Sequence, residues 1–200
     1  MNNLAYKLEF IEESHIYLVD GRKRVSTTTL LKQNGLYGNI LQFATDEHLW
    51  RGKAIHEAME YYNKGTLDWS KLDPAIRPYI SAFELFQKEK GFIPRGWELH
   101  LWHPVLDYTG TPDVWGDVGP EIWVMDYKSG VVPRGTGVQL AAYKSLLIVN
   151  DLIPKDKIIR RVGIQLKSDG DYKLTPFNDP VDENIWQMII SINNWRNANA

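Results

Sequence analysis

The sequence predicts an α/β domain with a mixed central β-sheet flanked by helices, and three observations indicate this class. The chain has 200 residues, 44% apolar and 24% charged, which is ordinary for one globular domain with a sizeable core. Apolar residues recur at helical spacing over residues 43–90, whereas strand-like alternation replaces that spacing over residues 97–128. The expected order of two helices, three strands, a helix, two strands and a helix is typical of a sheet covered by helices.

Residues 1–42 are expected to form a hairpin and a short helix. Asp20-Gly21 is a strong hairpin-turn signal. Ser26 or Thr27 can cap a helix that runs through Lys32. Short strands in this section are predicted at Tyr6–Phe10, His15–Val19 and Arg24–Val25.

Residues 43–150 are expected to form the core of the domain. A first helix runs from about Phe43 to Asn63, and a second follows Asp73-Pro74 and ends at Lys90. The elements that follow are strands at Trp97–His103, Tyr108–Val114 and Ile122–Lys128, and a helix at Thr136–Asn150.

Residues 151–200 are expected to add two strands and a helix. The strands Ile158–Leu166 and Asp171–Thr175 are joined by a Ser-Asp-Gly turn, and an amphipathic helix covers Asp182–Trp195. Because no repeat, low-complexity segment or linker divides the chain, residues 1–200 are expected to form a single domain.

The composition excludes several classes of protein. Because the chain has no cysteine, a disulfide scaffold, a thiol nucleophile, a cysteine-held iron–sulfur cluster and a zinc ribbon are excluded, and oxygen and imidazole must hold any metal. No apolar run approaches 18 residues, and Met1–Phe10 does not resemble a secretory signal, so a cytoplasmic location is expected. The net charge of −2 argues against nucleic-acid binding through a broadly basic surface.

Two carboxylates and a lysine are predicted to meet where buried strands end. In Ile122–Lys128, strand alternation places Asp126 and Lys128 on one face and Tyr127 on the other. The strand is apolar, and a Ser-Gly pair follows it directly. Asp126 and Lys128 are therefore expected at the C-terminal end of a buried strand, where α/β proteins place their sites. Asp113 ends the preceding predicted strand and can face Asp126.

Each of these parts also has a plainer interpretation. An isolated D-x-K is usually a surface salt bridge, and Asp113 alone is often a turn residue. Two converging carboxylates with a lysine beside them are instead typical of a hard-oxygen site for a divalent cation.

A third candidate group lies on the first long helix. His56 and Glu60 share a face one turn apart, next to the apolar stripe. The plainer interpretation of a lone helical histidine is packing or capping. Gly52 costs helix stability relative to alanine, which indicates the close approach of another backbone or of a ligand.

A fourth group follows the glycine-rich loop at Gly135-Thr136-Gly137. Gln139 and Tyr143 lie one turn apart on the helix that this loop opens, and the helix N-terminus could receive a phosphate. The alternative is a polar pair on a solvated helix face.

Basic and aromatic side chains supply candidates for nucleic-acid contacts. Basic clusters are usually solvated turns, but two of them are dense enough to suggest a DNA track: Arg22-Lys23-Arg24 at the hairpin tip, and Lys155, Lys157, Arg160 and Arg161. Three aromatic side chains could stack on unpaired bases, although core packing is the commoner role of tryptophan: Trp102, Tyr108 and Trp115.

Taken in order, the motifs resemble the RecB-type branch of the PD-(D/E)XK nuclease superfamily. They are G-x-x-x-H-x-x-x-E (Gly52, His56, Glu60), G-x-x-D (Gly110, Asp113), D-Y-K-S-G (residues 126–130) and Q-x-x-x-Y (Gln139, Tyr143). The match spans about half of the chain. The earlier pattern H-x-Y-x-x-D-G followed by V-S-T-T-T-L-L is also similar to phage-encoded members, although it is much less specific.

The resemblance implies a restriction-endonuclease-like core that binds one or two Mg²⁺ or Mn²⁺ ions. The implied ligands are His56, Asp113, Asp126 and the backbone carbonyl of Tyr127, and an imidazole ligand favours Mn²⁺. The implied catalytic set is Asp113, Asp126 and Lys128, in which the lysine orients the attacking water and offsets charge on the phosphate.

Further roles follow from the same resemblance. Glu60 and Glu98 would support the metal ligands without binding the ion themselves, or Glu98 would bind a second ion. Gln139 and Tyr143 would hold the substrate backbone, together with the basic residues Arg22, Lys23 and Arg24.

The expected activity is that of a metal-dependent deoxyribonuclease, most simply a stand-alone exonuclease acting on DNA ends in recombination or repair. The alternatives are an endonuclease or flap-cutting nuclease of the same fold, and a catalytically dead DNA-binding or scaffold module. The expected partners are single- or double-stranded DNA and a single-strand-annealing or recombination protein, with no membrane and no nucleotide cofactor. If the protein is phage-encoded, the host cytoplasm is expected.

Overall fold

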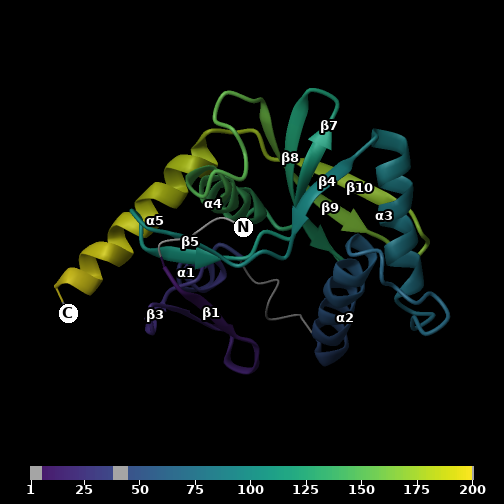
Figure 1. Cartoon of the computed structure of the whole chain (residues 1–200), viewed down its shortest axis with the longest axis horizontal. Helices are drawn as coiled ribbons and strands as arrows, with labels where there is room; N and C mark the ends of the chain where they lie inside the picture. The colour runs from purple at the N-terminus through teal and green to yellow at the C-terminus, as the bar shows by residue number, and fades with distance from the viewer. Residues whose placement is uncertain (1–5, 38–44, 200) are drawn as a thin grey trace.

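A five-stranded mixed sheet forms the centre of the computed structural model, which describes residues 6–37 and 45–199 (Figure 1). The strands lie in the order β10-β9-β8-β7-β4. Their bounds are Ile93–Trp97 for β4, Val114–Val118 for β7, Glu121–Lys128 for β8, Ile159–Leu166 for β9 and Tyr172–Pro176 for β10. The predicted fold class, a mixed central sheet flanked by helices, is confirmed.

The only parallel pair among these five strands is β8 and β9. Helix α4 (Thr136–Val149) connects them, as a parallel pair requires, and the register places Asp126 opposite Gly163. The remaining neighbours pair in antiparallel fashion, and β7 and β8 form a hairpin that turns at Gly119, whose φ of 57° suits glycine.

Helices cover both faces of the sheet and enclose two cores (Figure 1). Helices α2 (Asp46–Asn63) and α3 (Arg77–Lys90) pack on the face that carries Met125 and Tyr127. Helices α4 and α5 (Val181–Ala198) pack on the opposite face, which carries Ile122 and Val124. The predicted start of the first long helix, at Phe43, lies outside the described residues. Among the helices of the described ranges, none combines the length and apolar character that crossing a membrane requires.

A three-stranded sheet precedes this body. Its strands β1 (Leu8–Ile11), β2 (Ile16–Val19) and β3 (Arg22–Arg24) are antiparallel, with a 3-10 turn at Glu12–Ser14 between the first two. The predicted turn at Asp20-Gly21 is confirmed, since both residues have positive φ and Val19 pairs with Arg22. The basic triplet is therefore strand β3 rather than the hairpin tip. The Ser26 hydroxyl caps α1 (Thr27–Gln33) by accepting from the Thr29 N–H.

Two predicted strands are wrong as single elements, because each is divided in two. Trp97–His103 breaks at Glu98, whose φ of 43° ends β4 before β5 (Leu101–His103) begins. Tyr108–Val114 breaks at Pro112, which has no N–H to donate to a ladder, and this separates β6 (Tyr108–Gly110) from β7. The β5–β6 hairpin pairs apart from the central sheet.

Candidate active site

Three carboxylates lie side by side where three neighbouring strands end. Trp97 of β4 pairs with Val114 of β7, which in turn pairs with Met125 of β8. An acid lies next to each of these residues at the same end of the sheet: Glu98 follows Trp97, Asp113 precedes Val114 and Asp126 follows Met125. The backbones of the three acids are therefore neighbours across the sheet, separated by about one strand spacing, near 4.8 Å. The Glu98 N–H donates to the Asp113 carbonyl at 3.1 Å, which keeps the first two together.

His56 reaches this row from α2. Its Nδ1 lies 3.0 Å from Glu98 Oε1 and its Nε2 lies 3.8 Å from Asp113 Oδ2. One ligand atom from each of His56, Glu98 and Asp113 lies within 4.8 Å of the others, a grouping that could hold a metal ion. Glu98 therefore lies in this group beside His56, whereas the resemblance implied either a supporting role outside the metal ligands or the binding of a second ion. Glu60 instead has its carboxylate 2.6 Å from Lys64 Nζ.

Burial and like charge make Asp113 an unusual acid. Its side chain is 8% exposed, and burial together with the neighbouring Asp126 carboxylate raises the pKa of Asp113 to about 8. Burial alone lowers the pKa of His56, but the Asp113 and Glu98 carboxylates outweigh it and raise that pKa to about 9. The metal-free cluster therefore holds protons at neutral pH that a cation would displace.

Asp126 and Lys128 share one face of β8, as predicted, because their side chains are two residues apart on a strand. The Lys128 amino group is in ion-pair contact with Asp126 Oδ2, and Asp126 is 1% exposed. Asp126 Oδ1 is buried and accepts no hydrogen bond within the described ranges. Tyr127 points to the opposite face and its ring is buried in the core under α2 and α3, while its N–H donates to Asp113 Oδ2 at 2.8 Å.

Gln139 and Tyr143 face the row from α4. Both are buried, and the Gln139 side-chain amide donates to the Tyr143 hydroxyl at 3.0 Å. Gln139 Oε1 is buried and has no partner among the described residues. The alternative of a solvated polar pair is therefore wrong. Gly110 explains how Tyr143 fits, since a Cβ at Gly110 would lie about 3.0 Å from the Tyr143 ring.

The glycine-rich loop before these residues does not offer a phosphate site at the helix end. Its first N–H groups already donate to carbonyls one turn earlier, at Pro133, Arg134 and Gly135. The Asp182 carboxylate lies against Gly137 and would repel an anion there. The expectation of a phosphate at this N-terminus is therefore wrong.

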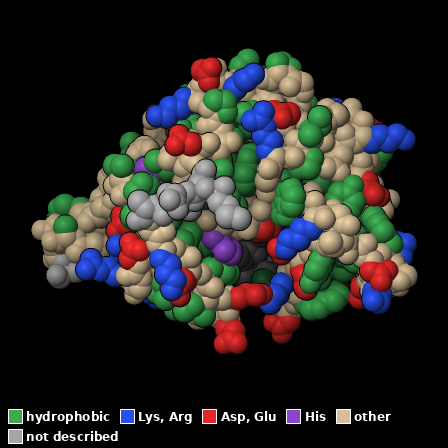
Figure 2. All heavy atoms as spheres, in the orientation of Figure 1, with side chains coloured by type: hydrophobic (Ala, Val, Ile, Leu, Met, Phe, Trp, Pro, Cys, Tyr) green, Lys and Arg blue, Asp and Glu red, His purple; other side chains and the backbone are tan. Residues whose placement is uncertain are grey.

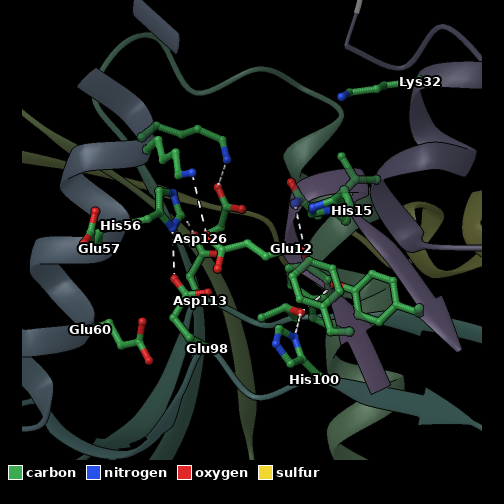
Figure 3. Close-up of a pocket in the computed structure, with 18 of the residues that line it drawn as sticks. Glu12, His15, Lys32, His56, Glu57, Glu60, Glu98, His100, Asp113 and Asp126 are labelled. Atoms are coloured by element: carbon green, nitrogen blue, oxygen red, sulfur yellow. Dashed lines mark hydrogen bonds and ion pairs between the residues drawn. The ribbon is translucent and has the colours of Figure 1, made fainter. Parts of the chain in front are cut away.

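These groups line one open cleft of about 980 Å³ (Figure 2). The cleft brings together eight of the residues singled out from the sequence: His56, Glu60, Glu98, Asp113, Asp126, Lys128, Gln139 and Tyr143. It also includes side chains that the sequence reasoning missed, on the segments nearest the N-terminus and at residues 100 and 111: Phe10, Glu12, His15, Tyr17, His100 and Thr111. The H-x-Y pattern at His15 and Tyr17 was the available signal for two of them. Figure 3 shows His56, Asp113, Asp126 and Glu98 on one side of the cleft, with His15 and His100 on the other.

The basic triplet lies next to this cleft rather than in it. Lys23 and Arg24 line a second groove of about 780 Å³, which shares His15, Thr28 and Lys32 with the cleft. Arg24 is engaged with Asp107 at 2.6 Å, whereas Arg22 and Lys23 are exposed.

Several other expectations are wrong. Gly52 has no described atom within 4 Å of where a Cβ would lie, so of its two expected neighbours, a backbone or a ligand, the backbone is the one that is wrong for the described residues. Tyr108 and Trp115 are buried at 0% and 3% exposure and cannot stack on a base. Arg161 is also buried, and Arg160 is bound to Glu121, so the second basic cluster is not a continuous track.

Comparisons with known proteins find similarity among solved structures but not among family models or curated sequences. No protein-family model matches the sequence, and no curated protein matches it. Among solved structures, the chain is similar to one described as "Crystal Structure of LHK-Exo in complex with dAMP", with 15% sequence identity and a TM-score of 0.35. That alignment covers 84% of this chain and 85% of the other. Function therefore has to be inferred from the geometry of the cleft.

Proposed function

We propose that this protein is a divalent-metal-dependent nuclease that hydrolyses phosphodiester bonds of DNA, acting as an exonuclease on DNA ends in recombination or repair. The observation that carries this proposal is the row of Glu98, Asp113 and Asp126 at three adjacent strand ends, with His56 and Lys128 beside it in one cleft. The order of the motifs, which resembles the RecB-type nucleases, supports the choice of DNA ends as substrate.

The residues present fit a divalent cation. Asp126 Oδ1 is buried without a partner among the described residues, and one ligand atom from each of His56, Glu98 and Asp113 lies within 4.8 Å of the others. We infer that Asp113, Asp126, His56 and Glu98 hold Mg²⁺ or Mn²⁺, with the Tyr127 carbonyl as a further ligand. When bound, the cation supplies a Lewis acid for the phosphate and lowers the pKa of water.

Lys128 serves as a fixed cation beside the scissile phosphate. Burial lowers the pKa of Lys128, but the carboxylates of Asp126 and Asp113 outweigh it and raise that pKa. The amino group therefore stays protonated in the metal-free protein. A protonated lysine offsets charge that develops on the phosphate and orients the attacking water through its N–H groups.

Gln139 and Tyr143 position the substrate strand. Burial, the largest effect, and the carboxylate of Asp113 both raise the pKa of Tyr143, so its hydroxyl stays neutral. Gln139 Oε1 is buried without a partner among the described residues, and we infer that it accepts a hydrogen bond from the substrate or from water. Both side chains would act by hydrogen bonding that fixes register without reading sequence.

One cleavage assay tests the proposal. End-labelled linear DNA and circular DNA, single and double stranded, are incubated with Mg²⁺, Mn²⁺ or EDTA. We expect degradation of linear DNA only with a cation, and loss of about 10²-fold or more in rate for Lys128→Ala, whose metal binding persists by calorimetry. Lys88→Ala, at the exposed end of α3, is the matched control and keeps the wild-type rate.

The same assay separates the alternatives. Cutting of circular DNA would identify an endonuclease. Binding of DNA with no cleavage under any cation would identify a non-catalytic DNA-binding module. Cleavage that continues in EDTA would overturn the metal-dependent activity.

A further inference from the structure

The cleft has a second wall that the proposed chemistry does not use. Opposite the carboxylates, the N-terminal sheet and the segment just before β5 present a cluster of rings (Figure 3). We name this cluster the aromatic wall, and its members are Phe10, His15, Tyr17 and His100.

The rings of the aromatic wall are held in contact with one another. The Phe10 ring centre lies 4.3 Å from that of His100, 4.6 Å from that of Tyr17 and 5.1 Å from that of His15. The Tyr17 hydroxyl and His100 Nδ1 each lie 2.7 Å from the Thr111 hydroxyl. Segments distant in the sequence thus fix the wall before any ligand binds.

The wall is open to the cleft rather than closed in the core. Tyr17 is buried at 2% exposure, but Phe10 and His100 are only half-buried and His15 is exposed. None of the four belongs to either hydrophobic core beneath the sheet. Half-exposed rings that line a cleft present faces on which a flat, uncharged group can stack.

The wall is tied directly to the carboxylate row. His100 lies two residues after Glu98, and Thr111 lies two residues before Asp113. Two residues span at most about 7 Å of backbone. The wall and the carboxylate row are therefore close enough to contact the base and the phosphate of a single nucleotide.

We propose that the aromatic wall stacks on the nucleobase of the nucleotide whose phosphate lies at the carboxylate row. This inference rests on the proposed function. Since a ring can stack on an open face of any base, the subsite would tolerate every sequence. A base that stacks there has left its duplex, so the strand must be unpaired at the cleaved nucleotide.

The test uses oligonucleotides that carry 2-aminopurine or an abasic residue at the end being degraded. In Ca²⁺ or EDTA, binding of the wild-type protein should quench 2-aminopurine fluorescence, because stacking on the wall is present before cleavage. In Mg²⁺ or Mn²⁺, the wild-type protein should cleave the terminal abasic nucleotide about 5- to 100-fold less efficiently than a natural one.

Three variants isolate the ring itself. Phe10→Leu keeps the apolar bulk and should lose both the quench and the preference for a natural base. Phe10→Trp should keep both. Ile11→Ala, on the same strand but not on the cleft, is the matched control and should behave as wild type.

The outcomes separate this inference from the proposed function. If the wild-type protein cleaves DNA but treats abasic and natural ends alike, or if Phe10→Leu keeps the quench, the subsite is wrong and the nuclease proposal stands. If the wild-type protein neither binds nor cleaves DNA, the proposed function fails and the subsite fails with it.

Discussion

Asp113 is the residue whose protonation governs the site, since it lies between two other acids and beside His56. Its folded pKa of about 8 lies above the ordinary value of 3.8, and that of His56, about 9, lies above 6.5. Between each pair of values the folded protein binds a proton that the unfolded chain has lost. Stability from these two groups is complete at low pH and disappears as pH rises through the folded values.

We therefore expect the free energy of unfolding of the metal-free protein to fall between about pH 4 and about pH 9. Urea denaturation in EDTA across this range measures it. Asp113→Asn should flatten the part of the slope below about pH 8, because its amide does not titrate, and the amide oxygen can still accept from the Tyr127 N–H. A wild-type stability that rises with pH over this range would contradict the prediction.

The same protons compete with the cation. At pH 8, Mn²⁺ at about 100 times its dissociation constant should raise the free energy of unfolding by about 2.7 kcal/mol, and the gain should shrink at pH 5. Differential scanning calorimetry with and without Mn²⁺ measures both. Asp113→Asn should lose most of the gain, whereas Asp117→Asn, a surface acid of β7 bound to Arg95, should keep it. Equal stabilisation of wild type and Asp113→Asn would show that the ion binds elsewhere.

At the scale of elements, a buried ion network joins β9, α4 and α5 behind the cleft. Arg161 is 3% exposed, donates to the carbonyls of Gly137 and Asp179, and lies 3.6 Å from Asp182 Oδ2. Gly137 lies in the first turn of α4, the helix that carries Gln139. This network therefore helps to position the α4 side of the cleft.

Arg161→Leu should lower the free energy of unfolding by about 3 kcal/mol, because it leaves Asp182 buried with fewer partners. Urea denaturation checks this. The adjacent Arg160 points the other way, to Glu121 at the surface, so Arg160→Leu is a matched control that should change stability little. Similar losses for the two variants would contradict the assignment of the network.

At the scale of the whole molecule, attraction for DNA has to come from local groups, since the net charge is −2. Arg22 and Lys23 are exposed on β3, beside a groove that continues into the cleft. Arg22→Gln with Lys23→Gln should reduce the slope of log binding constant against log salt by about 1.5 to 2, because two phosphate contacts are lost.

Fluorescence titrations at several salt concentrations measure that slope, and single-turnover cleavage of bound DNA should stay near the wild-type rate. Lys88→Gln with Lys90→Gln removes the same charge from the far end of α3 and should leave the slope unchanged. If both pairs change the slope equally, β3 has no special part in binding.

The sequence by itself determined what depends on neighbours along the chain. Helical and strand periods are local, so the class of fold, the Asp20-Gly21 turn and the shared face of Asp126 and Lys128 could be predicted. Only the tertiary structure decided which distant residues meet. Strand β4 contains Pro94 and Gly96, which hide its alternation and are tolerated because it is an edge strand, and its pairing with β7 brings Glu98 beside Asp113. The aromatic wall formed by Phe10, His15, Tyr17 and His100 was hidden for the same reason. Its members come from separate segments, and contacts between strands depend on register and packing across the molecule, which no local pattern encodes.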